Sequence, residues 1–62
     1  MPMTPRQMVI LLQRNGFVRI TQNGSHLKLF NKITQKTVIV PLHNKDLGIG
    51  LEQSILKQAG LK

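Results

Sequence analysis

The sequence predicts a small α+β domain with the element order α-β-β-β-α, in which a three-stranded antiparallel sheet carries both helices on one face. Three observations predict this class: a capped amphipathic segment at the start, an alternating hairpin around Asn23-Gly24, and a second amphipathic segment behind a third strand. The 62 residues have room for one domain, residues 1–62, with a small core.

The first helix begins with a strong capping pattern. Thr4 is suited to be the N-cap, Pro5 fits the first helical position, and Gln7 completes a capping box. The apolar side chains at helical spacing are Met8, Leu11 and Leu12, with Val9 at the margin. Gly16 can end the helix because it tolerates a positive φ, and Phe17 can then fold back on the apolar stripe.

The next segment has the pattern of a β-hairpin. Residues 17–22 and 25–30 alternate between apolar and polar side chains, and Asn23-Gly24 is a strong turn signal. We therefore expect a two-residue turn centred on Asn23-Gly24. Such a turn pairs Thr21 with His26, Ile20 with Leu27, Arg19 with Lys28, and Val18 with Leu29.

Alternation along this hairpin would sort its side chains onto two faces. The side chains that would face the helices are Val18, Ile20, Leu27 and Leu29. Those on the open face would be Arg19, Thr21, His26 and Lys28. The like-charged neighbours Arg19 and Lys28 could hold a phosphate between them, or they could extend separately into solvent.

The rest of the chain supplies one more strand and one more helix. A polar loop at residues 31–36 precedes a third strand at 37–40, which Pro41 ends. A polar connection with several glycines, residues 42–50, leads to the second helix. The apolar positions of this helix are Leu51, Ile55, Leu56 and Ala59. Gly60, followed by Leu61, has the pattern of its C-cap.

Charge points to a polyanionic partner. Nine Lys and Arg residues against two acids give a formal net charge of +7, which favours nucleic acid, an acidic protein or an anionic membrane. We expect nucleic acid because the sequence has no strongly basic amphipathic helix that would lie on a membrane. The start of the chain lacks a signal-peptide pattern, and the apolar run at 8–12 is too short to span a bilayer. A cytoplasmic protein with no membrane partner is therefore expected.

The composition also excludes several chemistries. Asp46 and Glu52, the only acids, cannot form the carboxylate cluster of a two-metal nuclease, and the same shortage of acids argues against a paired-carboxylate glycosidase. The absence of cysteine excludes thiolate catalysis and Cys-based zinc sites. We expect neither a metal nor a cofactor, and proton transfer would rest on histidine.

His26 is the candidate catalytic residue. An imidazole exchanges protons near neutral pH, so it can activate a ribose 2′-hydroxyl that attacks the adjacent phosphorus. Lys28, two residues along the same face, is the natural cation for the transition-state charge. Gly24 and Ser25 could offer backbone N–H groups and a hydroxyl to a phosphate. Considered without further context, however, a single surface histidine is more often not catalytic.

Three more residues are candidates for secondary roles. His43 follows the third strand, where it is most simply a loop imidazole bonded to a backbone carbonyl; it could instead be a second acid/base group beside His26. Lys32 and Lys36, in the polar loop, could extend a phosphate-binding track from Lys28.

Four motifs in order resemble the HicA family of bacterial toxins, which are partners of HicB antitoxins. These are Asn15-Gly16-Phe17 after a capped helix, Gly24-Ser25-His26 after a hairpin turn, Val40-Pro41-x-His43, and the ending Ile55-Leu56-Lys57-Gln58-Ala59-Gly60-Leu61. The resemblance extends from Thr4 to Leu61. One departure is Gly50-Leu51-Glu52, where family members often have Gly-Thr-Leu, so we expect the second helix to lack the cap that this threonine would supply.

The resemblance implies a fold like that of double-stranded RNA-binding domains and an mRNA-cleaving toxin that is neutralised by its antitoxin. It places the family's catalytic histidine on His26, with Gly24 and Ser25 as the motif residues before it. Together with the charge balance, this predicts a metal-independent endoribonuclease that acts on mRNA and pairs with an acidic HicB-like antitoxin.

Two other functions compete with this prediction. A non-catalytic basic RNA-binding module of the same fold would keep the charge and would not need His26. A small DNA-binding protein has little support, because strands separate the two helices and no helix-turn-helix spacing is present.

Overall fold

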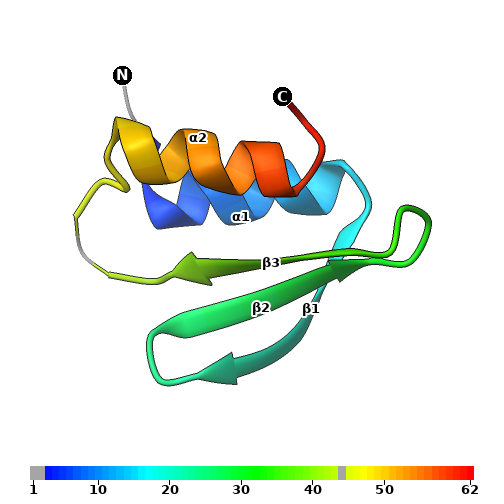
Figure 1. Cartoon of the computed structure of the whole chain (residues 1–62). Helices are drawn as coiled ribbons and strands as arrows, with labels where there is room; N and C mark the ends of the chain where they lie inside the picture. The colour runs from blue at the N-terminus through cyan, green and yellow to red at the C-terminus, as the bar shows by residue number, and fades with distance from the viewer. Residues whose placement is uncertain (1–2, 44) are drawn as a thin grey trace.

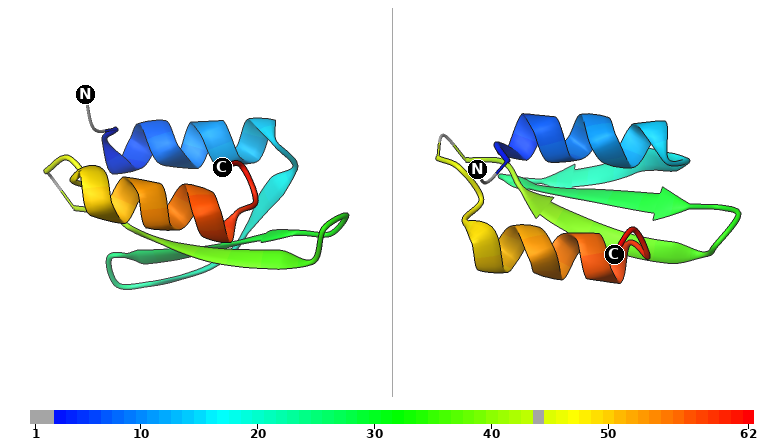
Figure 2. Two further views of the ribbon diagram at one scale, coloured as in Figure 1. Left: turned by 45° about the horizontal axis from the view of Figure 1, so that its top comes forward. Right: turned by 90° about the horizontal axis from the view of Figure 1, so that it is seen from above.

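The computed structural model describes residues 3–43 and 45–62, and the elements follow the expected order. They are α1 (Pro5–Arg14), β1 (Phe17–Asn23), β2 (His26–Asn31), β3 (Lys36–Pro41) and α2 (Ile49–Gln58). The strands form an antiparallel sheet in the order β1-β2-β3. Both helices lie on the same face of this sheet and leave the other face open (Figures 1 and 2). The predicted α-β-β-β-α class is therefore confirmed.

The capping box predicted for α1 is present. The Thr4 hydroxyl oxygen accepts a hydrogen bond from the Gln7 amide at 3.2 Å, and the Gln7 side-chain oxygen accepts one from the Thr4 amide at 3.0 Å. These two bonds satisfy donors that a helix start otherwise leaves free. The chain leaves the helix through Gly16, whose φ of +94° favours glycine.

The core lies between the two helices and the covered face of the sheet. The helices supply Met8, Val9, Leu12, Ile55 and Ala59. The rest of the chain supplies Phe17, Leu27, Leu29, Val38, Val40 and Leu47. In β2 and β3 these residues alternate with exposed ones, so the pleat alone determines which side chains reach the open face.

The register predicted for the hairpin is wrong. The turn is formed by Gly24-Ser25, so Asn23 pairs with His26 and Thr21 with Lys28. Gly24 has a φ of +63°, which a tight hairpin turn with glycine at its first central position requires. The pairing then shifts at Ile20, so that Arg19 pairs with Leu29 and Phe17 with Asn31.

Because of the β-bulge at Ile20, the side chains in the first half of β1 lie on the opposite faces of the sheet from those expected. One additional residue in a strand moves every following side chain to the other face of the sheet. Phe17 is therefore buried at 2% exposure, whereas Val18 and Ile20, which we expected in the core, are 46% and 53% exposed. The physical reason is that this register buries the large aromatic ring of Phe17 in place of two smaller side chains.

The start of α2 lacks a side-chain cap, but the expected position of that cap is wrong: the helix begins at Ile49, so Leu51, where family members often have threonine, is its third residue. Its N-cap is Gly48, and no side chain bonds to the first turn. Glu52 ties this end of the helix to the start of the chain, because its carboxylate accepts a hydrogen bond from the Met3 amide at 3.0 Å. The helix ends as predicted: Gly60 has a φ of +77°, and the Leu61 amide donates to the Leu56 carbonyl at 2.9 Å.

Candidate functional site

His26 is the first residue of β2 and points to the open face. Its neighbour Leu27 is buried at 2% exposure beneath the helices, so alternation places the imidazole on the opposite side, where it is exposed. A shallow hollow of about 380 Å³ lies there. Its lining residues are Thr21, Asn23, His26, Lys28 and Ile39.

The hollow combines a proton-transfer group with a cation. His26 and Lys28 come from alternate positions of β2, Thr21 and Asn23 from the facing positions of β1, and Ile39 from β3 opposite Lys28. No carboxylate is among the lining residues. An imidazole, an ammonium, a hydroxyl and an amide in one open hollow can receive a phosphodiester, transfer a proton and stabilise added negative charge.

Gly24 and Ser25 form the turn directly before His26. The Gly24 carbonyl accepts a hydrogen bond from the Gln22 side-chain amide at 3.0 Å, and the Ser25 carbonyl accepts one from the Leu42 amide. These bonds join the turn to β1 and to the segment after β3. They position His26 at the end of the sheet, with both turn residues exposed beside it.

Lys32 and Lys36 do not lie beside the hollow. His26 pairs with Pro41 at one end of the β2–β3 ladder and Asn31 with Lys36 at the other, which separates the two ends by about 16 Å. The aliphatic part of Lys36 also lies against Gly60, at the end of α2. Lys36 therefore does not extend a phosphate track along the open face, whereas the role expected for Lys32, which is exposed, stays a prediction.

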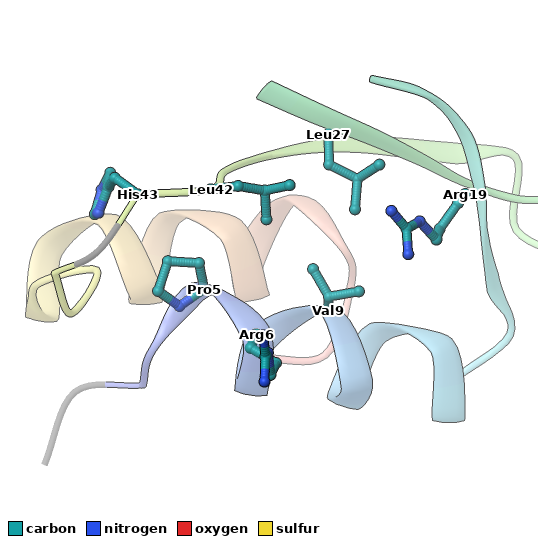
Figure 3. A pocket seen from close by; sticks show the side chains of 7 residues that line it. All are labelled: Pro5, Arg6, Val9, Arg19, Leu27, Leu42 and His43. Atoms are coloured by element: carbon teal, nitrogen blue, oxygen red, sulfur yellow. The ribbon is translucent and has the colours of Figure 1, made fainter. Parts of the chain in front are cut away.

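Arg19 and His43 line a second groove, on the helix side of the sheet. Its lining residues are Pro5, Arg6, Val9, Arg19, Leu27, Leu42 and His43, and its volume is about 330 Å³ (Figure 3). The expected open-face patch of Arg19, His26 and Lys28 is therefore incomplete, because the bulge directs Arg19 toward α1. His43 is likewise not among the residues that line the hollow of His26.

Three of the residues that line the hollow, Thr21, Asn23 and Ile39, have no functional role predicted from the sequence. Asn23 was assigned to the turn, Thr21 was placed on the open face without a role, and Ile39 was not considered. The signal for Ile39 was present, because strict alternation between Val38 and Val40 leaves it on the open face. Asn23 could be assigned to the strand only if the turn was placed at Gly24-Ser25. The sequence left this open, because Asn23-Gly24 is also a turn signal.

Two classes of site are not found in the described part of the chain. Across residues 3–43 and 45–62, no group of three or more His, Cys, Asp or Glu side chains is arranged to hold a metal ion. Within the same residues, no helix has the length and apolar character needed to cross a membrane.

Comparison with known families identifies a matching family model. Residues 5–61 match the family model described as HicA toxin of bacterial toxin-antitoxin systems. No curated protein matches the chain. The family match includes the turn, the hollow and both helices, which is nearly the whole sequence.

Proposed function

The chain belongs to the HicA family of toxins from bacterial toxin–antitoxin systems, and we propose that it is an endoribonuclease that cleaves mRNA through His26. Family membership implies an antitoxin partner. The hollow around His26 and Lys28 is the observation that carries the proposal, because it joins a proton acceptor to a cation on a protein of net charge +7. A polyanionic RNA would be attracted to such a surface.

In the proposed reaction, the neutral imidazole of His26 accepts the proton of a ribose 2′-hydroxyl. The 2′-oxygen forms a bond to the adjacent phosphorus, and the bond from phosphorus to the 5′-oxygen breaks. The departing 5′-oxygen takes a proton from solvent, and the other product ends in a 2′,3′-cyclic phosphate. The ammonium of Lys28 stabilises the negative charge that develops on the phosphoryl oxygens.

The local fold supports these roles. Gly24-Ser25 fixes the end of β2, so His26 stands at the rim of the sheet, where an extended RNA strand can reach it. Pairing with Thr21 and Ile39 holds the backbone of Lys28 in the middle of the sheet. The distance between the two β2 positions is close to 7 Å along the strand, which suits one phosphodiester between their side chains.

The proposed cleavage needs no metal ion. Two-metal cleavage of a phosphodiester relies on clustered carboxylates, and Asp46 and Glu52 are the only acids. Glu52 is 8% exposed, is bonded to the Met3 amide near the start of α2, and does not line the hollow. The 2′-hydroxyl attack described above uses groups that the chain has.

End-group analysis of RNA products tests this proposal. The purified protein should cleave single-stranded RNA in EDTA and leave 2′,3′-cyclic phosphate ends or their hydrolysis products. A strict requirement for Mg²⁺ with 3′-hydroxyl ends would contradict the mechanism. Binding of RNA without any cleavage would favour the alternative, a non-catalytic basic RNA-binding module of the same fold.

The proposed partner is an acidic HicB-like antitoxin in the cytoplasm, and its simplest way to neutralise the toxin is to cover the open face. The excess of positive charge supports an acidic partner. A neighbouring reading frame for an acidic protein, and its co-purification with this chain, would test that pairing.

A further inference from the structure

The groove on the helix side is a second concentration of positive charge, separate from the hollow of His26. Arg19 and His43 lie at its two ends, and Leu27, Leu42 and Val9 lie between them (Figure 3). Arg6 joins from α1. Consecutive residues of β2 serve the two sites, because His26 lines the hollow and Leu27 lines the groove from the other face of the sheet.

The β-bulge at Ile20 creates this groove's charge. Without the register shift, the turn at Gly24-Ser25 would place Arg19 on the open face opposite Phe30; with it, Arg19 pairs with Leu29 and extends toward α1. The two acids of the chain are not among the groove's lining residues. An arginine turned toward the apolar side of a sheet, with no carboxylate in the lining, leaves its donors available for an anion.

The apolar floor of the groove indicates which class of ligand it can bind. A free phosphate or sulfate needs only cations, but here the surface between the two arginines and His43 is formed by the apolar side chains of Val9, Leu27 and Leu42. Nucleobases have apolar π-faces that pack on such surfaces or stack on imidazole rings. Arginine binds phosphate oxygens in a bidentate manner. The volume of about 330 Å³ is at the lower end of small-ligand pockets.

We propose that this groove binds one nucleotide of single-stranded RNA, with the base on Val9, Leu27 and Leu42 and the phosphate on Arg6 and Arg19. The inference rests on the proposed function for its ligand class, since RNA is the proposed substrate. It adds a binding site on the face opposite the scissile bond. The chain would thus hold RNA on both sides of the β1–β2 hairpin.

The test measures binding of an octaribonucleotide that is 2′-O-methylated at every position, so that no 2′-hydroxyl can attack. Arg19→Gln should weaken its affinity roughly tenfold, as expected for the loss of one charge-assisted contact, and Arg6→Gln should weaken it in the same direction. The matched control is Arg14→Gln, which removes the same charge from the exposed end of α1, outside the groove. In ¹⁵N-labelled native protein, the oligonucleotide should shift the amides of Val9 and Leu27.

Three results would overturn the proposal. Equal affinities for Arg19→Gln and Arg14→Gln, with unmoved groove amides, would mean that RNA does not enter the groove. Groove shifts of equal size with inorganic phosphate would mean that the apolar floor has no part in binding. If Arg19→Gln weakened only the binding of an acidic antitoxin, the groove would belong to the protein partner. Because the probe cannot be cleaved, each result is independent of whether His26 is catalytic.

Discussion

Asn31 is a buried amide that joins three parts of the chain. It is 4% exposed; its nitrogen donates to the Asn15 carbonyl at 3.0 Å, and its oxygen accepts from the Ile33 and Thr34 amides at 2.9 and 3.2 Å. The side chain thereby fastens the exit of α1 to the end of β2 and to the following loop. All buried polar side-chain atoms in the described residues have a hydrogen-bond partner.

Replacing Asn31 with Ala should lower the free energy of unfolding by about 2–3 kcal/mol, because it leaves the Asn15 carbonyl and two loop amides without their partner. Urea denaturation followed by circular dichroism measures this change. Gln13→Ala, on the exposed side of α1, is the control and should change stability by less than about 0.5 kcal/mol. An effect of Asn31→Ala as small as that of the control would contradict the role assigned to the amide.

Lys28 is the residue that the account makes responsible for charge stabilisation. Lys28→Gln should slow RNA cleavage by about tenfold to a hundredfold and reduce the slope of log affinity against log salt by about 0.7. Lys57→Gln removes an equal charge from the last turn of α2 and serves as the control. If the two variants cleaved at the same rate, Lys28 would not act in the transition state.

Among the helices and strands, the register of β1 decides which of its side chains enter the core and which are exposed. In the observed register Ile20 is exposed, whereas a hairpin without a bulge would place it in the core. Ile20→Thr should therefore change the free energy of unfolding by less than about 0.5 kcal/mol, while Leu29→Ala, at a fully buried position, should lower it by about 2–5 kcal/mol. A loss of several kcal/mol in Ile20→Thr would show that the bulge is absent in solution.

Helix ends that are marked by a short run of residues were predictable from the sequence. The hairpin turn was not, because two overlapping pairs of residues both suit it. Thr4, Pro5 and Gln7 determine the start of α1 within a few residues, and Gly60 marks the end of α2. By contrast, Asn23-Gly24 and Gly24-Ser25 both suit a two-residue turn, and only the packed core decides between them. The bulge had one indirect signal: Phe17 had to reach the apolar stripe of α1, and strict alternation would have turned its ring away.

In the whole molecule, site residues on one strand were predictable as neighbours, whereas residues brought together by the fold were not. His26 and Lys28 were predictable as neighbours because they belong to one strand and are separated by one residue. Arg19, Lys36 and His43 depend on pairings between distant segments, so the sequence could not show that they lie away from the hollow. Charge totals give an excess of +7, but only the fold divides it between an open face with His26 and a groove with Arg19.

The central claim is that His26 carries out the chemistry of an RNA-cleaving toxin. The most direct measurement compares RNA cleavage in EDTA by the native protein and by His26→Ala, with circular dichroism to establish that the variant is folded. Because the imidazole is exposed, the fold should persist while the cleavage rate falls by about 10²-fold or more. Replacing the other histidine, His43→Ala, should lower the rate much less. A folded His26→Ala protein that cleaved RNA at the native rate would contradict the account.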